Sequence, residues 1–115
     1  MEPMILGETL TIPAATQYSG FWMPSGGSDG VAAFEVFFVS GTSLVVGVES
    51  KSSEAADPAP LTAVVGFYFG AITSPGIFNF ELVDAKDLVR YALSNTGMSP
   101  VTVHIKFARP SWAPN

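Results

Sequence analysis

The stretch that decides the fold is Val101-Thr102-Val103-His104-Ile105-Lys106-Phe107-Ala108, close to the end of the chain. Large apolar residues occupy every second position, and Thr102, His104 and Lys106 lie between them. A period of two is the period of a β-strand, whose successive side chains point to opposite faces. One apolar face and one polar face predict a strand in an antiparallel sheet, with the core on one side and water on the other.

The same alternation recurs upstream, where Phe78, Phe80 and Leu82 alternate with Asn79 and Glu81. Further β-rich runs are separated by turn residues, Gly and Pro above all, and we find no convincing helical periodicity. The predicted strands are 9–12, 17–23, 31–39, 44–51, 61–72, 77–83, 88–94 and 101–108. This pattern predicts an all-β fold, an antiparallel β-sandwich of about eight strands that is jelly-roll-like or immunoglobulin-like.

The length of the chain fits one domain. Its 115 residues can bury one proper core but not two. We therefore expect a single β-sandwich domain over residues 1–115, with a short N-terminal arm. The segment 109–115 contains Pro110 and Pro114, and we expect it to form a tail without regular structure.

Charge is sparse in this sequence. Hydrophobic residues make up 48% of the chain and charged residues only 13%, about half the usual share. A folded monomer of this size exposes roughly 6,000 Å², so its surface carries about one charge per 400 Å². Apolar surface of that extent is usually covered by a partner. We expect a protein partner or a homo-oligomer; the alternative is a monomer whose surface is rich in Ser, Thr and Gly.

Several partners and compartments are disfavoured by the same composition. The five basic residues are scattered along a chain of net charge −5, whereas nucleic-acid binding needs clustered cations. The longest apolar run, 64–72, is broken by Gly66 and Gly70 and is too short to span a membrane as a helix. The N-terminus lacks the pattern of a secretory signal. We expect no nucleic-acid or membrane partner.

Catalytic constellations are not visible in the sequence. Cysteine is absent and His104 is the single histidine, so the ligands of a zinc site and the base of a nucleophilic triad are both lacking. Glu35, Glu49 and Glu81 lie at outward strand positions, where pairing with Lys106 or Arg90 is the simpler interpretation. We predict no enzymatic activity, no cofactor and no metal site.

The candidate binding residues are aromatic or apolar. In the third predicted strand, Phe34, Val36 and Phe38 alternate with Glu35, Phe37 and Val39, so both faces are largely apolar. Such a strand is either central in its sheet or covered by a neighbouring subunit, and this makes Phe37 and Val39 candidate interface residues.

Three further aromatic residues, Tyr18, Trp22 and Trp112, are candidates for an interface anchor or a sugar-stacking platform. We assign their neighbour Phe21 to the core. Trp112 lies in the tail, which has no core position of its own. We expect it to dock on a neighbouring subunit; the alternative is docking on its own sandwich.

Two groups of residues carry a resemblance to a known family. The first is Asp87-Leu88-Val89-Arg90-Tyr91, followed by a turn that reaches Gly97-Met98-Ser99-Pro100-Val101-Thr102-Val103. The second is Val39-Ser40-Gly41-Thr42-Ser43-Leu44-Val45-Val46 with Val48-Glu49. Over roughly residues 31–108 the chain resembles the small β-sandwich structural proteins of tailed bacteriophages. In these proteins an arginine-tyrosine strand and a Gly-Thr-Ser-Pro-like turn precede the last strand.

The sequence departs from that family at two places. Ser43-Leu44 stands where a serine-proline pair is usual, and Lys51-Ser52-Ser53-Glu54 replaces an Asp-Gly-Ser segment. The resemblance implies a virion structural protein, such as a capsid decoration protein that binds the major capsid protein or other virion proteins. It supplies no catalytic residues. A tail or head–tail joining component and a carbohydrate-binding module are the alternatives.

Overall fold

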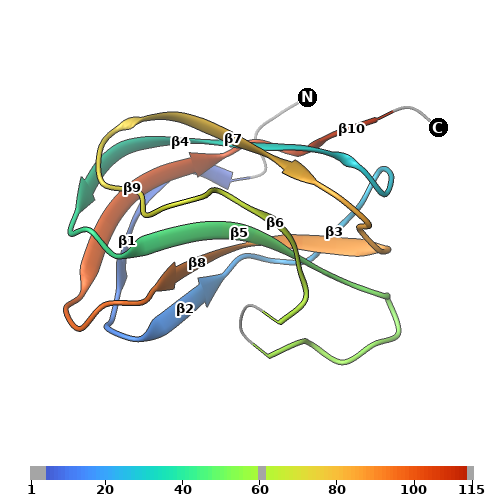
Figure 1. Cartoon of the computed structure of the whole chain (residues 1–115), viewed down its shortest axis with the longest axis horizontal. Helices are drawn as coiled ribbons and strands as arrows, with labels where there is room; N and C mark the ends of the chain where they lie inside the picture. Colours follow the sequence, from blue (N-terminus) through green and yellow to red (C-terminus); the bar gives the residue numbers. More distant parts are fainter. Residues whose placement is uncertain (1–4, 60–61, 114–115) are drawn as a thin grey trace.

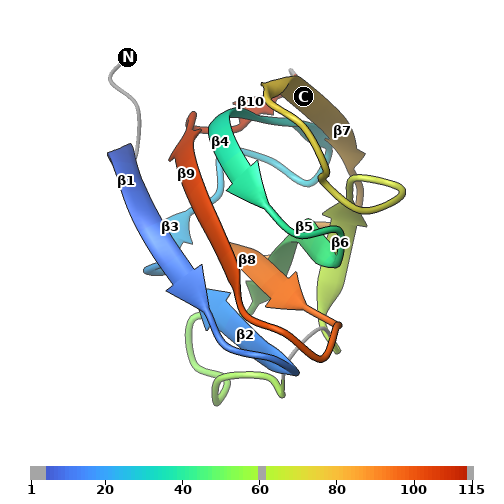
Figure 2. The same ribbon diagram turned by 90° about the vertical axis from the view of Figure 1, so that its left-hand side faces the viewer.

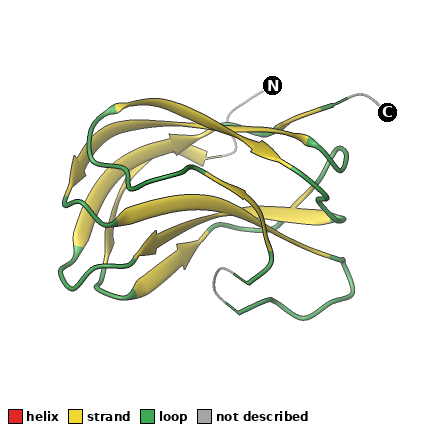
Figure 3. Ribbon diagram, viewed as in Figure 1, coloured by secondary structure: helices red, strands yellow, loops and turns green. Residues whose placement is uncertain are grey.

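The computed structural model describes residues 5–59 and 62–113, which fold into two packed antiparallel sheets (Figures 1 and 3). The strands are β1 (Ile5–Ile12), β2 (Thr16–Ser19), β3 (Met23–Pro24), β4 (Gly30–Ser40), β5 (Leu44–Lys51), β6 (Val64–Phe67), β7 (Gly76–Leu82), β8 (Leu88–Asn95), β9 (Val101–Phe107) and β10 (Ser111–Trp112). The predicted all-β, antiparallel two-sheet architecture is confirmed. Within the described ranges, no helix is long and apolar enough to cross a membrane.

The strands divide evenly between the layers. Sheet A has the order β1-β9-β4-β7, and β10 also pairs with β4. Sheet B has the order β2-β8-β5-β6, and β3 also pairs with β8. Figure 2 shows the two sheets facing each other, with β6 of sheet B beside β7 of sheet A.

The predicted strand 17–23 is interrupted. β2 ends at Ser19 and β3 resumes at Met23, both against the same partner β8. The N–H of Gly20 still donates to the carbonyl oxygen of Tyr91, at 2.9 Å. Phe21 lies in the interruption and is 55% exposed, so its assignment to the core is wrong.

The predicted strand 61–72 is shorter than expected, and Leu61 lies outside the described residues. β6 ends at Phe67, and an isolated bridge from Ile72 to Leu44 follows it. Within β6, Gly66 lies so close to β7 that an added Cβ would collide with the carbonyl oxygen of Glu81. The edges of the two sheets touch at this glycine. Beyond β6 the contact with β5 continues only at separate points, where the N–H groups of Tyr68 and Ile72 donate to the carbonyl oxygens of Val46 and Leu44 at 3.0 and 2.7 Å.

From its prolines we expected a tail without regular structure, and this expectation is wrong. Ser111 and Trp112 pair with Val31 and Gly30, on the same side of β4 as β9, which ends opposite Phe34. β10 therefore continues the line of β9 after a short break.

The Trp112 ring packs against the core of its own domain. It lies where Gly30 has no side chain, because a Cβ there would be 2.9 Å from a ring carbon of Trp112. In the described structure the tail thus lies on its own sandwich, which is one of the two places that we expected for it. Docking of Trp112 on a neighbouring subunit stays a prediction.

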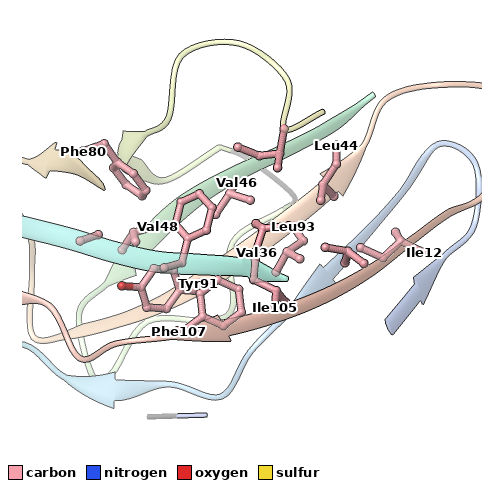
Figure 4. Close-up of a cluster of buried hydrophobic side chains, with 14 of the residues drawn as sticks. Ile12, Val36, Leu44, Val46, Val48, Phe80, Tyr91, Leu93, Ile105 and Phe107 are labelled. Carbon is pink, nitrogen blue, oxygen red and sulfur yellow. The ribbon is translucent and has the colours of Figure 1, made fainter. Parts of the chain in front are cut away.

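The core fills the space between the sheets (Figure 4). Tyr91 reaches from sheet B across this layer and stacks on Phe107 of sheet A, with ring centroids 4.3 Å apart. Its hydroxyl accepts the N–H of Ala33 at 3.2 Å and lies 2.8 Å from the carbonyl oxygen of Ala108. Burial raises the pKa of Tyr91 well above its ordinary value. Tyr91 is therefore both a core residue and a bridge between the sheets.

Candidate interaction surfaces

The outer face of sheet A carries an exposed aromatic pair. β4 has a bulge between Val36 and Phe38, and the extra residue changes which side chains point outward. Phe37 is 47% exposed and Phe38 is 51% exposed. Val39, opposite Val103, packs against the core. Phe37 keeps its place as a candidate, whereas the bulge overturns the outward placement of Val39 and gives that role to Phe38.

His104 lies beside this pair on β9. Its Nδ1 is 3.0 Å from the hydroxyl of Thr9, and its ring stands perpendicular to the Phe37 ring, with centroids 5.2 Å apart. The histidine thus contacts one hydroxyl and one aromatic ring. In the described ranges no cluster of histidine and carboxylate side chains is arranged to hold a metal.

The next level of the same face mixes one apolar residue with two charges. Ile77 of β7 is opposite Glu35 of β4, and Glu35 is in turn opposite Lys106 of β9. Ile77 is 75% exposed. These three residues border a hollow of about 230 Å³ whose other lining residues include Ala33 and Ala108. We call the surface formed by Glu35, Phe37, Phe38, Ile77, His104 and Lys106 the sheet A face.

A second apolar surface lies where the edges of the two sheets meet. Phe69 follows β6 and is 83% exposed, and its ring packs against Phe67 with centroids 4.7 Å apart. With Val83, which follows β7, they border a groove of about 500 Å³. We call it the edge groove. Sequence reasoning missed it, although the spacing of Phe67 and Phe69 in a glycine-broken apolar run was a signal.

The outer face of sheet B carries a polar network. The Nε of Arg90 donates to the carboxylate of Glu49 at 2.9 Å, and the Glu49 side chain is fully buried. Gln17 donates to the second oxygen of the same carboxylate at 3.3 Å. The expected cross-strand charge pairing is confirmed at Arg90, which pairs with Glu49; for Lys106 the described side chains show no ion pair. Glu35 and Glu81 lie on sheet A instead, so the three glutamates do not converge.

Trp22 covers this network and fastens a loop onto it. Its ring lies 4.3 Å from the guanidinium carbon of Arg90 and 5.0 Å from the Lys51 ammonium. Its indole N–H donates to Asp57 at 3.1 Å, and Lys51 bonds the same carboxylate oxygen at 2.8 Å. The hydrogen bond and charge of Lys51 hold the pKa of Asp57 below its ordinary value. We call Trp22, Lys51, Asp57 and Arg90 the loop clamp.

The three candidate aromatics do not form a row. Tyr18 is opposite Leu93, on the core-facing side of an edge strand in sheet B. Trp22 lies over Arg90 on the outer side of the same sheet, and Trp112 is paired into sheet A. The structure thus places them on three separate surfaces, and a sugar ring could stack on no more than one of them at a time.

No family model matches this chain, and no curated protein matches it. The surfaces described above are therefore the basis on which a role can be assigned. Of these, the sheet A face and the edge groove expose apolar side chains, whereas the loop clamp satisfies its own polar groups.

Proposed function

We propose that this protein is a virion structural protein of jelly-roll topology that binds the outside of a phage capsid and stabilises it. The pairing order supports the topology. β1 pairs with β9, β2 with β8, β4 with β7 and β5 with β6, so the first half of the chain pairs with the second half in reverse. A long antiparallel hairpin wrapped into two sheets gives this order. In an immunoglobulin-like order the first two strands share a sheet, whereas here β1 and β2 do not.

Jelly rolls are common in viral capsid and lectin domains, but a fold by itself does not give a function. The observation that carries the proposal is the edge groove, where Phe69 is 83% exposed beside Phe67. An aromatic side chain in that position gains most from burial against another protein. The sparse charge of the chain agrees with such burial.

The proposed mechanism is the covering of joints between capsid subunits. One contact of standard size buries about 800 Å² per partner and need not be tight. Repeated over a lattice, with each copy contacting more than one subunit, weak contacts become strong through multivalency. The groove supplies an anchor point, and the rigid sandwich holds that anchor at a fixed position. The protein then acts in the virion, after assembly in the host cytoplasm.

Co-sedimentation with capsids assembled from the major capsid protein of the same genome tests this proposal. We expect the protein to saturate the capsids and to raise their dissociation temperature. Phe69→Ala should weaken binding at least tenfold, because it removes the groove's most exposed ring. Met98→Ala is the matched control, since Met98 is also exposed but lies in the turn between β8 and β9.

Four results would overturn the assignment or change it. Equal binding by the wild type and Phe69→Ala would exclude the groove, and no binding to capsids would exclude decoration. Binding to purified tails or connectors in place of heads would place the protein elsewhere in the virion. Retention on polysaccharide columns, lost in Phe69→Ala, would favour the carbohydrate-binding alternative, with Phe69 as its stacking residue.

A further inference from the structure

We infer that two copies of this chain associate through the sheet A face, related by a twofold axis that runs along the strands between β4 and β9. The inference concerns a different surface from the edge groove and is independent of the capsid proposal. It rests on unpaired charges, on the register of the strands and on the size of the face.

The charges at the centre of the face form no ion pair with the described part of the chain. Glu35 and Lys106 are directly opposite each other on β4 and β9. Among the side chains that the structure describes, the ion pairs join Lys51, Asp57, Arg90 and Glu49. Glu35 and Lys106 therefore present one negative and one positive charge side by side, and both are open to pairing with a second molecule.

The register makes the face complementary to itself. Glu35 and Lys106 lie at one level of the two strands, and Phe38 and His104 lie at the next. A twofold axis midway between β4 and β9, which are neighbours in Figure 2, exchanges the two strands. Glu35 then faces Lys106 of the second copy, and Phe38 faces His104 of the second copy. Each contact occurs twice, as an isologous interface requires.

The charge balance favours a second copy over an unrelated acidic or basic partner. The chain carries a net charge of −5, so two copies repel each other over most of their surfaces. At the centre of the sheet A face the net charge is zero, because Glu35 and Lys106 carry opposite charges. Bringing two such faces together forms two opposite-charge pairs and buries Phe38 and Ile77 near them. The two opposite-charge pairs thus offset, at the interface, the repulsion between two negatively charged chains.

The size of the face sets the strength of the association. Four strands of about seven residues cover roughly 23 by 19 Å, a projected area of roughly 450 Å² before the relief of the side chains is added. Two such faces bury an area near the lower end of specific interfaces, where association is weak and reversible. We therefore expect a dimer that dissociates on dilution through the micromolar range.

Two opposite charge reversals test the inference by sedimentation equilibrium. Glu35→Lys sets two ammonium groups against each other across the interface, and Lys106→Glu sets two carboxylates against each other. Each variant alone should dimerise at least tenfold more weakly than the wild type. An equimolar mixture should form a heterodimer, because both contacts then pair opposite charges. The doubly reversed variant should dimerise like the wild type.

Matched controls separate this effect from net charge and folding. Glu54→Lys and Lys86→Glu make the same charge changes at exposed positions outside the sheet A face, and they should dimerise like the wild type. Thermal unfolding of each variant checks that the sandwich is intact.

A wild type that stays monomeric at about 200 μM, well above the expected dissociation range, would overturn the inference. So would single reversals that dimerise normally, or a mixture that forms no heterodimer. Capsid binding is measured separately, through Phe69→Ala, so failure of either idea leaves the other standing.

Discussion

The phenol oxygen of Tyr91 lies 2.8 Å from the carbonyl oxygen of Ala108, so a side chain of sheet B bonds the backbone of sheet A. The contact falls where β9 ends, just before the break that leads to β10. The same hydroxyl accepts the N–H of Ala33 on β4. Tyr91 therefore joins the two sheets at the point where β4 passes from one partner strand to the next.

Replacing Tyr91 by Phe keeps the ring but removes these bonds. Because backbone groups of Ala33 and Ala108 lose a buried partner, we expect the free energy of unfolding to fall by about 1–3 kcal/mol. Urea unfolding followed by circular dichroism measures the change. Tyr18→Phe is the control, since Tyr18 is partly exposed at a sheet edge, and it should change stability by less than about 0.5 kcal/mol. Equal losses in both variants would contradict the bridge.

The raised pKa of Tyr91 predicts that the folded protein loses stability at alkaline pH. The folded chain keeps this phenol neutral, whereas the unfolded chain releases its proton near the ordinary value of 10.0. The unfolded state thus binds fewer protons above that pH, and the free energy of unfolding falls as pH rises beyond it. Urea titrations at pH 9, 10 and 11 should show a steeper fall for the wild type than for Tyr91→Phe. Parallel curves would show that Tyr91 is not the cause.

The lowered pKa of Asp57 predicts that the loop clamp survives mild acid. A depressed carboxyl pKa means that the clamp is present above the ordinary value of 3.8 and is lost as pH falls through the lower folded value. In a Trp112→Phe background, Trp22 fluorescence should stay constant from pH 7 to about pH 4 and change below it.

Asp57→Asn should bring that fluorescence change to neutral pH and expose the loop to proteases. Glu54→Gln, in the same loop, should do neither. A clamp that opens between pH 5 and 6 would point to another titrating group.

The absence of a side chain at Gly30 predicts how the tail can be released. A Cβ there meets the Trp112 ring at 2.9 Å and collides with the backbone of Ser111. Gly30→Ala should therefore shift the Trp112 emission to longer wavelength and cost about 1–3 kcal/mol of stability. In Gly27→Ala the nearest contact is an ordinary 3.5 Å, so that variant should leave Trp112 buried. Unchanged emission in Gly30→Ala would mean that the backbone adjusts without releasing the tail.

The alternation of apolar and polar residues was enough to predict the strands that have one face in the core and one face in solvent. The alternation of Val101, Val103 and Ile105 with polar residues placed β9 correctly. The same reasoning failed at Val39. A bulge arises from the pairing of two strands, so the extra residue at Phe37 cannot be recognised from the alternation within the β4 sequence alone.

The sites that were missed depend on contacts distant in sequence. Trp112 has a place in sheet A only because Gly26 and Gly30 leave room for its ring, and nothing near Trp112 in the sequence indicates that room. Glu49 was expected at an outward position, as it is, but its complete burial requires Arg90 from another strand. Phe69 falls within the predicted strand 61–72, whereas β6 ends at Phe67, before it.

The position of β9 has a consequence for how the chain acquires its structure. β9 lies between β1 and β4, and pairs with both. During synthesis β1 has no neighbour in its sheet until β9 has been made, and such distant pairings make folding slow. Until then β1 and one side of β4 are open edges, which can pair wrongly with other chains. We expect nascent chains truncated before Val101 to aggregate, and release of β9 from the ribosome to be the step that commits the sandwich to its native form.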